Sequence, residues 1–250
     1  MLDDKVKKVA EILGNQPSLT ILTGAGVSAE SGVPTFRGPD GLWRQFRAED
    51  LATPEAFYRN PKLVWEWYDW RRQKIQKVKP NPAHLVIARW EKYFPSFILI
   101  TQNVDGLHRQ AGSTKILELH GNIWWVRCLK ENKVMENRQV PLIQIPPLCS
   151  DCGSLLRPHV VWFGEALPAD ILEAAFNACY RSEIMMVIGT SALVQPAASL
   201  PLIAQQHGAI IVEINLEPTP LSHYADYSLY GKAGEILPLI DELIFKEKME

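Results

Sequence analysis

The sequence predicts an α/β protein with a doubly wound parallel sheet and a smaller inserted domain. Three observations predict this fold class: short, nearly continuous apolar runs recur along the chain, amphipathic segments separate them, and two stretches of different composition interrupt the alternation. Strands that are apolar on both faces are typical of a parallel sheet covered by helices on both sides.

The predicted elements alternate between helix and strand from the N-terminus onward. An N-terminal helix ends at Gly14, because apolar residues recur at helical spacing before this glycine. The predicted strands are four β-branched or apolar runs, at 19–23, 97–101, 184–188 and 209–214. The other helices each have one apolar face and cover about 83–90, 168–182, 197–207 and 236–244.

Two stretches break this alternation and are predicted to form the smaller domain. Residues 34–79 are rich in aromatic side chains, and residues 121–158 contain three of the four cysteines. Neither stretch alone is long enough for an independent core. We therefore expect one unit over 1–250, with a Rossmann-like core of about 1–34, 80–121 and 159–250 and a helical, zinc-ribbon-like domain of about 35–79 and 122–158.

Composition excludes several classes of protein. The chain has 26 basic and 28 acidic residues, so its net charge of −2 argues against direct binding of nucleic acid through the phosphate backbone. The charge-free run at 184–212 is interrupted by Pro196 and Pro201, which favours a buried core over a membrane span. The first eight residues lack the apolar run of a signal peptide, and four cysteines are too few for a disulfide scaffold. We expect a cytoplasmic protein.

Small or polar residues follow each of the four predicted strands, where an open parallel sheet binds its ligands. These strand ends are Thr23–Ser28, Thr101–Asp105, Gly189–Ser191 and Glu213–Asn215. The first contains Gly24-x-Gly26-x-x-Ala29, the alanine variant of the dinucleotide fingerprint, whose glycines allow a pyrophosphate close to the backbone. The sequence therefore predicts a nucleotide site, although a glycine-rich segment can also be only a tight turn.

The ribose-binding acid of a dehydrogenase is missing from this pattern. It is expected at the end of a second strand about 20 residues further on. Instead, the chain enters a loop without strand character at Pro34–Trp43, which has the composition of a lid.

Six segments occur together in the order in which sirtuins have them. They are Gly24–Gly38, Thr101–His108, Leu119–Gly121, Val161–Glu165, Gly189–Ser191 and Ile214–Asn215. Over nearly its whole length the sequence therefore resembles the sirtuins, the NAD-dependent protein-lysine deacylases, and in particular the prokaryotic class III type. The resemblance implies a Rossmann-like domain, a small zinc-bearing domain, and a cleft that NAD and an acylated lysine enter from opposite sides.

The resemblance implies an NAD-binding role for matching residues of this sequence. Ala25, Phe36 and Arg37 are expected at the pyrophosphate and nicotinamide ribose. Gln102 and Asn103 are expected at the ribose, and Asp105 at the nicotinamide carboxamide. The adenosine half is expected to contact Gly189, Thr190, Ser191, Asn215 and Ala233. The remaining residues assigned to the NAD site are Gly24, Gly26, Ser28, Trp43, Leu216 and Glu217.

The implied reaction gives His120 and Asn103 catalytic roles. The amide oxygen of an acyl-lysine attacks C1′ of the nicotinamide ribose, and nicotinamide leaves. A ribose hydroxyl then attacks the acyl carbon, which requires a base that titrates near neutral pH, and His120 is the candidate. The products are nicotinamide, free lysine and 2′-O-acyl-ADP-ribose. By spacing alone, His120 also fits a histidine in a turn before Gly121.

Two further segments are expected to bind the acylated peptide. Val160–Phe163 resembles the family segment that pairs with the substrate backbone, with Val161 and Phe163 as contacts, although it also fits an ordinary core strand. Tyr68 lies three residues before Arg71 on a predicted helix at 61–78, and together they suit an acyl chain that ends in a carboxylate. Spacing allows Arg72 equally, and it also allows a solvated helix with aromatic core contacts and no pocket.

The resemblance to class III sirtuins selects Arg71 from these alternatives. That class has Tyr-x-x-Arg on this helix and a small residue at the position of Ala52, which widens the pocket. Thr35, where many sirtuins have an acid, also fits the class. We therefore expect removal of succinyl and malonyl groups, with some deacetylation retained.

The cysteines predict a metal site with one thiol missing. Cys149-x-x-Cys152 has the spacing of half a zinc knuckle, and Cys128 lies at the right distance upstream. Its expected partner position holds Glu131, which leaves open a site of three cysteines with Glu131, a site completed by water, or a lobe packed around Trp124, Trp125 and Ile143 without metal.

Two other functions remain compatible with this sequence. One is an NAD-consuming ADP-ribosyltransferase or glycohydrolase, which uses the same C1′ chemistry with another acceptor. The other is a non-enzymatic NAD-sensing protein, against which the set of Asn103, Asp105 and His120 argues. The sequence predicts acylated-lysine proteins or peptides as partners and no oligomeric state.

Overall fold

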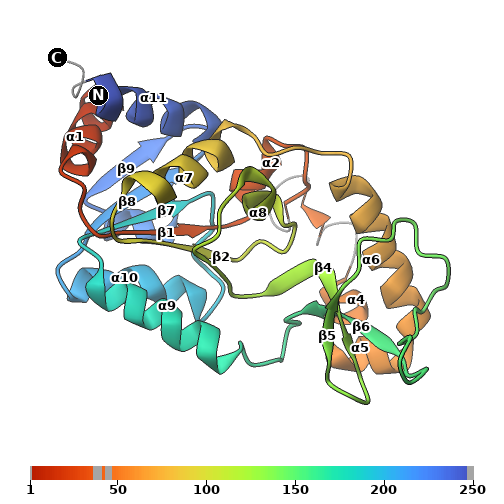
Figure 1. Cartoon of the computed structure of the whole chain (residues 1–250). Coiled ribbons are helices and arrows are strands. Elements are labelled where there is room, and N and C mark those ends of the chain that lie inside the picture. The colour runs from red at the N-terminus through yellow and green to blue at the C-terminus, as the bar shows by residue number, and fades with distance from the viewer. Residues whose placement is uncertain (1, 36–40, 43–46, 247–250) are drawn as a thin grey trace.

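The computed structural model describes residues 2–35, 41–42 and 47–246, which form two lobes (Figure 1). The large lobe contains a parallel six-stranded sheet with helices on both faces, and the small lobe contains a three-stranded antiparallel sheet with helices beside it. The predicted fold class is therefore confirmed. The residue limits that we expect for the two domains stay a prediction.

The large sheet has the strand order β3-β2-β1-β7-β8-β9. Its strands are β1 (Leu19–Thr23), β2 (Phe97–Thr101), β3 (Ile116–Glu118), β7 (Ile184–Ile188), β8 (Ile210–Asn215) and β9 (Tyr227–Tyr230). From β1 the chain first adds β2 and β3 on one side of the sheet. It then returns to add β7, β8 and β9 on the other side of β1, so the strand order reverses between β1 and β7. Such a reversal separates the loops that leave the two strands and opens a crevice at their carboxyl ends.

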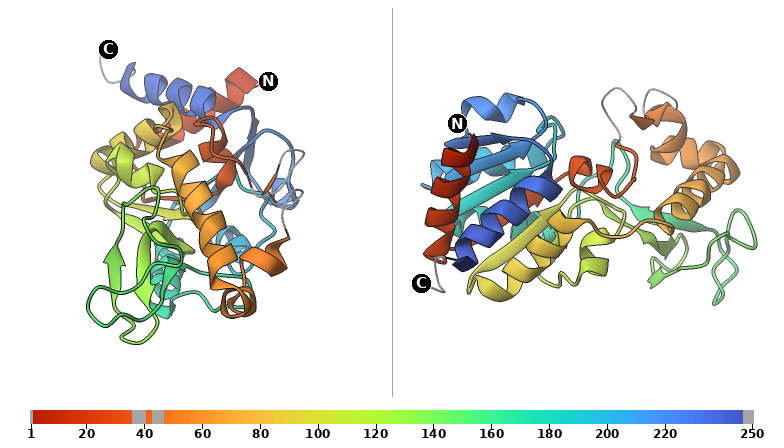
Figure 2. Two further views of the ribbon diagram at one scale, coloured as in Figure 1. Left: turned by 90° about the vertical axis from the view of Figure 1, so that its right-hand side faces the viewer. Right: turned by 90° about the horizontal axis from the view of Figure 1, so that it is seen from above.

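Helices cover both faces of this sheet (Figures 1 and 2). One face carries α1 (Leu2–Gly14), α7 (Pro82–Tyr93) and α11 (Ala233–Lys246), and the other carries α9 (Ala169–Arg181), the short turn η1 (Ala197–Ser199) and α10 (Leu200–Gln206). Each face has its own apolar core, because every residue of β1 and β7 is buried and alternate side chains point to opposite faces. The predicted helices and strands of this lobe are confirmed, while the short edge strands β3 and β9 were not predicted.

The small lobe consists of two segments that are distant in sequence. The first provides α4 (Ala48–Leu51), α5 (Pro54–Arg59) and α6 (Pro61–Ile75), and the second provides β4 (Gly121–Cys128), β5 (Val134–Glu136) and β6 (Leu156–Val160). Together they bury one apolar cluster that includes Trp65, Trp124 and Val126. Ile143 is 88% exposed and takes no part in this packing, so the alternative of a lobe packed around Trp124, Trp125 and Ile143 is wrong for Ile143.

Helix α6 begins where its sequence predicts. The Asn60 side chain accepts a hydrogen bond from the Leu63 N–H at 3.0 Å, and Pro61 occupies the first helical position. One face of α6 then packs on β4 and β6, which fixes the direction of its inward side chains.

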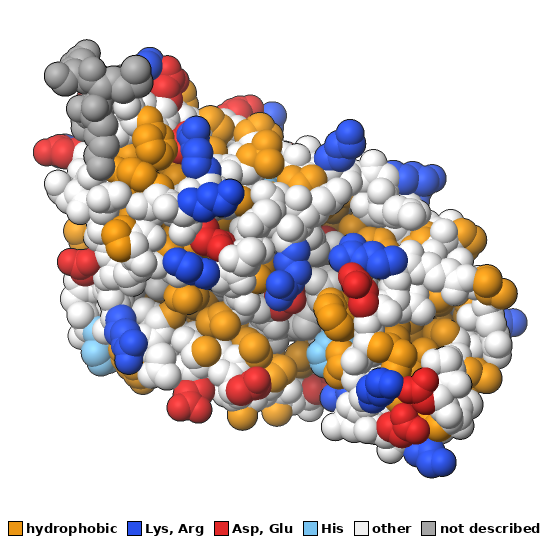
Figure 3. Space-filling view, in the orientation of Figure 1, with side chains coloured by type: hydrophobic (Ala, Val, Ile, Leu, Met, Phe, Trp, Pro, Cys, Tyr) orange, Lys and Arg blue, Asp and Glu red, His pale blue; other side chains and the backbone are white. Residues whose placement is uncertain are grey.

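Short elements follow the strand ends of the large sheet. They are α2 (Ala25–Ala29), α8 (Leu107–Ala111) and η2 (Pro220–His223). In the described part of the chain, no helix is long and apolar enough to cross a membrane. Charges of both signs are interspersed over the face seen in Figure 3, with no single basic area on that face.

Candidate active site and metal centre

A cavity of about 650 Å³ lies at the carboxyl ends of the central strands, where the two lobes meet. Residues from all four predicted strand ends line it. The predicted nucleotide residues on its wall are Gly24, Ala25, Gly26, Gln102, Asn103, Gly189, Thr190, Ser191, Asn215, Leu216 and Glu217. The topology therefore brings these segments together as predicted.

The turn after β1 packs backbone against backbone on the end of β7. The Gly26 N–H donates to the Gly189 carbonyl at 2.8 Å, and the Gly24 N–H donates to Ile188 at 3.0 Å. A Cβ atom added to Gly24 would lie 2.7 Å from Cβ of Thr190, and one added to Gly26 would lie 2.8 Å from Cα of Gly189. Both positions therefore require glycine for packing as well as for access to the backbone.

Amide side chains order the polar wall of the cavity. The Asn103 side-chain amide donates to the Gly24 carbonyl at 3.0 Å and to the Ser28 hydroxyl at 3.2 Å. Gln102 donates to the Thr190 hydroxyl at 2.9 Å, and Asn215 donates to the Thr190 carbonyl at 2.8 Å. These bonds hold the side chains in place without a ligand, so little ordering remains for binding.

Some predicted NAD residues lie away from this wall. Ser28 is fully buried behind it, and Ala233 is buried at the start of α11. Asp105 is buried and lines a second cavity of about 320 Å³, with its carboxylate accepting a bond from the Leu107 N–H at 2.8 Å. Burial raises the pKa of Asp105, although the bond from Leu107 acts in the opposite direction. Phe36, Arg37 and Trp43 lie outside the described residues.

His120 lines the cavity with a defined tautomer. Its Nδ1 lies 3.0 Å from the carbonyl oxygen of Gln102, which can only accept a hydrogen bond, so Nδ1 carries the proton. Nε2 of the neutral ring is therefore unprotonated and able to accept a proton. Burial lowers the pKa of His120, which favours this neutral form, although the bond to Gln102 acts in the opposite direction.

The residue after His120 fixes the turn that presents the imidazole. Gly121 has a φ of +75°, and a Cβ atom there would collide with the carbonyl oxygen of His159. Both readings of His120 from sequence therefore apply, because the histidine lies in a glycine turn and also faces the cavity.

Three small-lobe residues that the sequence assigns to an acyl pocket line the same cavity. Ala52, Tyr68 and Arg71 lie on its wall, and the two side chains on α6 are buried, with 3% and 7% of their surface exposed. Burial raises the pKa of Tyr68, so its hydroxyl stays protonated at neutral pH. Burial lowers the pKa of Arg71, opposed by Tyr68 and by the charge of Asp105.

Arg72 points away from the cavity, although spacing alone could not separate it from Arg71. Its guanidinium donates to the Asn137 side chain at 3.0 Å and lies 5.4 Å from the ring centroid of Trp124. Arg72 is therefore part of the packing of the small lobe. The aromatic core contacts of the alternative that sequence allowed are present, but Arg71 and Arg72 are buried, so a solvated position for them is wrong.

The segment at 160–163 differs from the predicted strand. Strand β6 ends at Val160, and Val161 and Phe163 continue as cavity wall without regular pairing. The Val161 N–H donates to the His120 carbonyl and the Phe163 N–H to the Ala52 carbonyl, both at 2.9 Å. The Trp162 N–H donates to Glu165 at 2.8 Å. Since these donors are used within the chain, a peptide paired here must bond to carbonyl groups.

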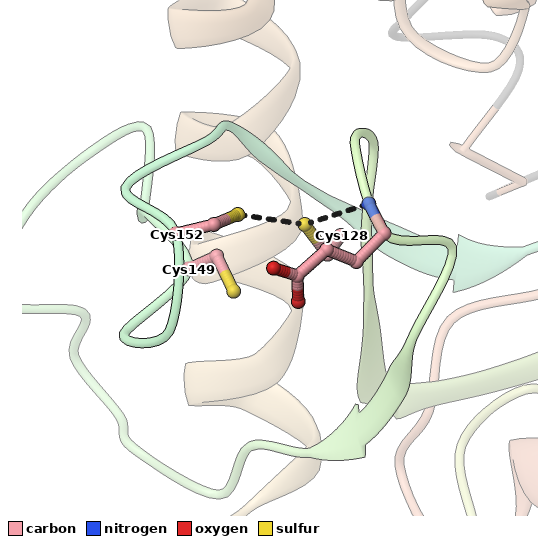
Figure 4. A group of neighbouring side chains, drawn as sticks. Cys128, Cys149 and Cys152 are labelled. Atoms are coloured by element: carbon pink, nitrogen blue, oxygen red, sulfur yellow. Dashed lines mark hydrogen bonds between the residues drawn. The ribbon is translucent and has the colours of Figure 1, made fainter.

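Three thiols and one carboxylate form the predicted metal cluster (Figure 4). Each of Cys128, Glu131, Cys149 and Cys152 offers a ligand atom, and these atoms all lie within 4.8 Å of one another. The sulfurs of Cys128 and Cys152 are 3.5 Å apart. Tetrahedral zinc with bonds of about 2.3 Å places two sulfurs about 3.8 Å apart, so the cluster fits a structural zinc ion with Glu131 as fourth ligand.

Several residues of the cavity wall were not predicted from the sequence. Leu193–Gln195 and Pro218–Pro220 lie on it, directly after strand ends that were identified. Trp162 also lines the cavity. The sequence predicted contacts for its neighbours Val161 and Phe163 but none for Trp162 itself. The available signals were the prolines that follow the polar strand ends and an aromatic side chain between two predicted contacts.

Comparison with known proteins agrees with this geometry. The Sir2 family model matches residues 24–196. An NAD-dependent protein deacylase of Aquifex aeolicus is 56% identical over 217 residues, covering 87% of this chain and 91% of that protein.

Solved structures resemble the whole molecule. The NAD complex of a Sir2 homologue has a TM-score of 0.90 and 50% identity, covering 96% of this chain and 94% of that one. The structure of Sir2Af2 bound to a myristoylated histone peptide has a TM-score of 0.80 and 34% identity, covering 99% of both chains. Because the family model matches more than half of the sequence and these similarities extend over nearly all of it, the chain belongs to the Sir2 family.

Proposed function

We propose that this protein removes acyl groups from protein lysines with NAD as co-substrate, and that succinyl and malonyl groups are among its substrates. The proposal of these acyl groups rests on the position of Arg71 and Tyr68. Both side chains line the cavity that His120 and Asn103 also line. A guanidinium and a phenol there suit an acyl chain that ends in a carboxylate.

The strand ends of the large lobe are proposed to hold NAD. Gly24 and Gly26 would leave the backbone open to a pyrophosphate, Gln102 and Asn103 would bind the ribose, and Asn215 and the residues after it would bind the adenosine half. All of these residues line the cavity. NAD supplies a glycosidic carbon whose bond to nicotinamide is broken in the reaction. The relative solved with NAD supports this placement.

His120 is proposed as the general base. Its Nε2 accepts the proton of a ribose hydroxyl, while Nδ1–H stays bonded to the Gln102 carbonyl and keeps the ring oriented. The lowered pKa of His120 keeps the ring neutral, and therefore able to act as a base, at physiological pH.

The small lobe is proposed to select the acyl group. Arg71 would bind the terminal carboxylate in a bidentate manner, and the Tyr68 hydroxyl would add one bond. Ala52 lines the cavity with a methyl group where a larger side chain would occupy space. The peptide is proposed to run along Val161–Phe163 and to bond to carbonyl groups there, since the N–H groups are already used. The relative solved with an acylated histone peptide supports a peptide substrate.

Matched acetyl-, malonyl- and succinyl-lysine peptides test this proposal. The protein is incubated with NAD and each peptide, and both products are identified by mass. We expect 2′-O-acyl-ADP-ribose with each acyl group. We also expect Arg71→Met to lower the ratio of succinyl to acetyl kcat/KM by about tenfold to a hundredfold, since a hydrogen bond to a charged group is lost.

Arg71→Lys is the control for charge, because it keeps the cation and loses the bidentate geometry. An intermediate ratio is expected for it. An unchanged ratio in Arg71→Met would contradict the acyl assignment alone. Plain ADP-ribose as the only product would indicate a glycohydrolase, and NAD binding without turnover of any peptide would indicate a sensor.

A further inference from the structure

A tryptophan that the reaction does not use contacts the acyl-pocket phenol. The indole N–H of Trp162 donates to the hydroxyl oxygen of Tyr68 at 2.9 Å. Both side chains line the cavity, and each is only 3% exposed. The bond connects Val161–Phe163, which is proposed to bind the peptide, with helix α6, which is proposed to bind the acyl group.

This bond determines the direction of the Tyr68 hydroxyl proton. A phenol has one proton to donate, and its oxygen here accepts from Trp162, so the O–H cannot point toward the indole. Among the described residues, no group accepts a hydrogen bond from this hydroxyl. The phenol is therefore left as a donor, and it faces the cavity that contains Arg71.

Both the backbone and the ring of Trp162 are held by neighbours. The backbone N–H of Trp162 donates to the Glu165 carboxylate at 2.8 Å, and the Arg157 guanidinium lies 3.6 Å from the centroid of the indole ring. Arg157 also pairs with Glu165, with the shorter of the two bonds at 2.6 Å. The Phe57 ring packs at a centroid distance of 5.2 Å. An indole fixed in this way can orient a partner, because its own rotation is prevented.

We propose that Trp162 is a positioning residue for acyl selection, turning the Tyr68 hydroxyl so that its proton is available to a carboxylate on the acyl chain. This inference rests on the proposed function and goes beyond it, because it assigns acyl selection to a side chain outside the Tyr-x-x-Arg pair. It also couples the peptide segment to the acyl pocket through a single hydrogen bond.

The test measures succinyl and acetyl kcat/KM on the same preparation of each variant. Trp162→Phe removes the indole N–H, and incorporation of 3-benzothienylalanine at position 162 removes it while keeping the two-ring shape. We expect either change to lower the succinyl-to-acetyl ratio by roughly threefold to tenfold, mainly through a higher KM for the succinyl peptide.

The Tyr68→Phe background distinguishes a positioning role of Trp162 from a merely structural one, because the two roles predict different succinyl-to-acetyl ratios for the double variant. Once the hydroxyl is gone, the indole has nothing to orient, so Trp162→Phe should not lower the ratio further in the Tyr68→Phe background. Trp90→Phe is the matched control, because Trp90 also loses one buried indole bond, to Asp241 at 2.8 Å, in the core of the large lobe. Its ratio should equal that of the unmodified protein.

Each outcome decides the question. An unchanged ratio with 3-benzothienylalanine, or equal losses with and without the Tyr68 hydroxyl, would overturn the role of Trp162 while leaving the acyl assignment standing. Absence of succinyl turnover by the unmodified protein would overturn the proposed acyl class and this inference together. If Trp162→Phe does not fold, the 3-benzothienylalanine protein alone gives the answer, since it preserves the packing on Arg157 and Phe57.

Discussion

The two halves of the cavity, one proposed to bind NAD and the other proposed to bind the acyl group, are built by different means. The nucleotide half is built from backbone and glycine, with Gly24 and Gly26 packed against the end of β7 so closely that no Cβ atom fits. The acyl half is built from buried side chains on α6, above all Tyr68 and Arg71. A backbone site is fixed by the fold, whereas a side-chain site can change with a few substitutions. One scaffold can therefore keep its NAD chemistry while its acyl preference varies.

The comparison predicts two classes of variant. A change in the nucleotide half or at His120 should reduce activity toward every acyl group in parallel. A change in the acyl half should alter the ratio between acyl groups.

Loss of the base at the junction should affect all substrates. We expect His120→Asn to lower kcat by about a hundredfold to ten-thousandfold for acetyl and succinyl peptides alike, because proton removal from the ribose hydroxyl loses its acceptor. His207→Asn is the matched control, since the His207 Nδ1 also contacts a backbone carbonyl, that of Ile203 at 2.9 Å, but lies on the surface. A loss confined to one acyl group would contradict the assignment of His120 to the shared chemistry.

The buried wall behind the nucleotide half should make stability depend on pH. Burial lowers the pKa of His84 to about 4, and its Nε2 lies 3.3 Å from the Ser28 hydroxyl. The folded state therefore binds fewer protons than the unfolded state, so its stability is fully present above about pH 6.5 and falls toward pH 4. We expect His84 to account for roughly 3 kcal/mol of this loss.

Denaturant unfolding at a series of pH values measures this dependence. His84→Gln should flatten the fall between pH 6.5 and 4, whereas exposed His207→Gln should not. An identical pH dependence in the unmodified protein and in His84→Gln would show that His84 is not held neutral in the folded state.

A methyl group in the nucleotide half should weaken NAD binding. The Cβ atom of Gly24→Ala would require Thr190 and Gly189 to move, so we expect the KM for NAD to rise at least tenfold and the free energy of unfolding to fall by about 1–3 kcal/mol. Gly14→Ala, with no atom near the added methyl group, should leave the KM for NAD unchanged and should not lower the free energy of unfolding. Equal NAD affinity in Gly24→Ala would show that the turn adapts and that the backbone argument is wrong.

Zinc binding by the metal cluster should depend on the carboxylate of Glu131. We expect Glu131→Gln to weaken zinc binding by about tenfold in a chelator competition, because a neutral amide replaces the charged ligand. Glu136→Gln is the control, since Glu136 is an exposed glutamate of β5 that is not part of the cluster. Equal zinc affinity for both variants would indicate a site of three cysteines completed by another ligand.

The sequence allowed the nucleotide half to be predicted because of a general property of open parallel sheets. Polar residues that directly follow apolar strands must meet at one edge, so Gly24, Asn103, Thr190 and Asn215 could be grouped without coordinates. The spacing of the three cysteines and Glu131 also allowed the metal cluster to be predicted.

The acyl half followed a weaker rule. Helical spacing put both Arg71 and Arg72 near Tyr68, and the family resemblance was needed to select Arg71. The structure separates them, because Arg71 lines the cavity while Arg72 packs on Trp124. The bond from Trp162 to Tyr68 joins residues that are 94 positions apart, and no local pattern predicts a contact of that kind. Val161–Phe163 was expected to extend a strand, but its N–H groups bond to His120, Ala52 and Glu165 instead.

A crystal structure with a succinyl-lysine peptide and a non-reactive NAD analogue tests the central claim most directly. We expect the succinyl carboxylate within hydrogen-bonding distance of both Arg71 and the Tyr68 hydroxyl, with the analogue's ribose facing Nε2 of His120. A carboxylate directed to solvent, or an acyl chain bound outside the cavity shared with His120, would contradict it.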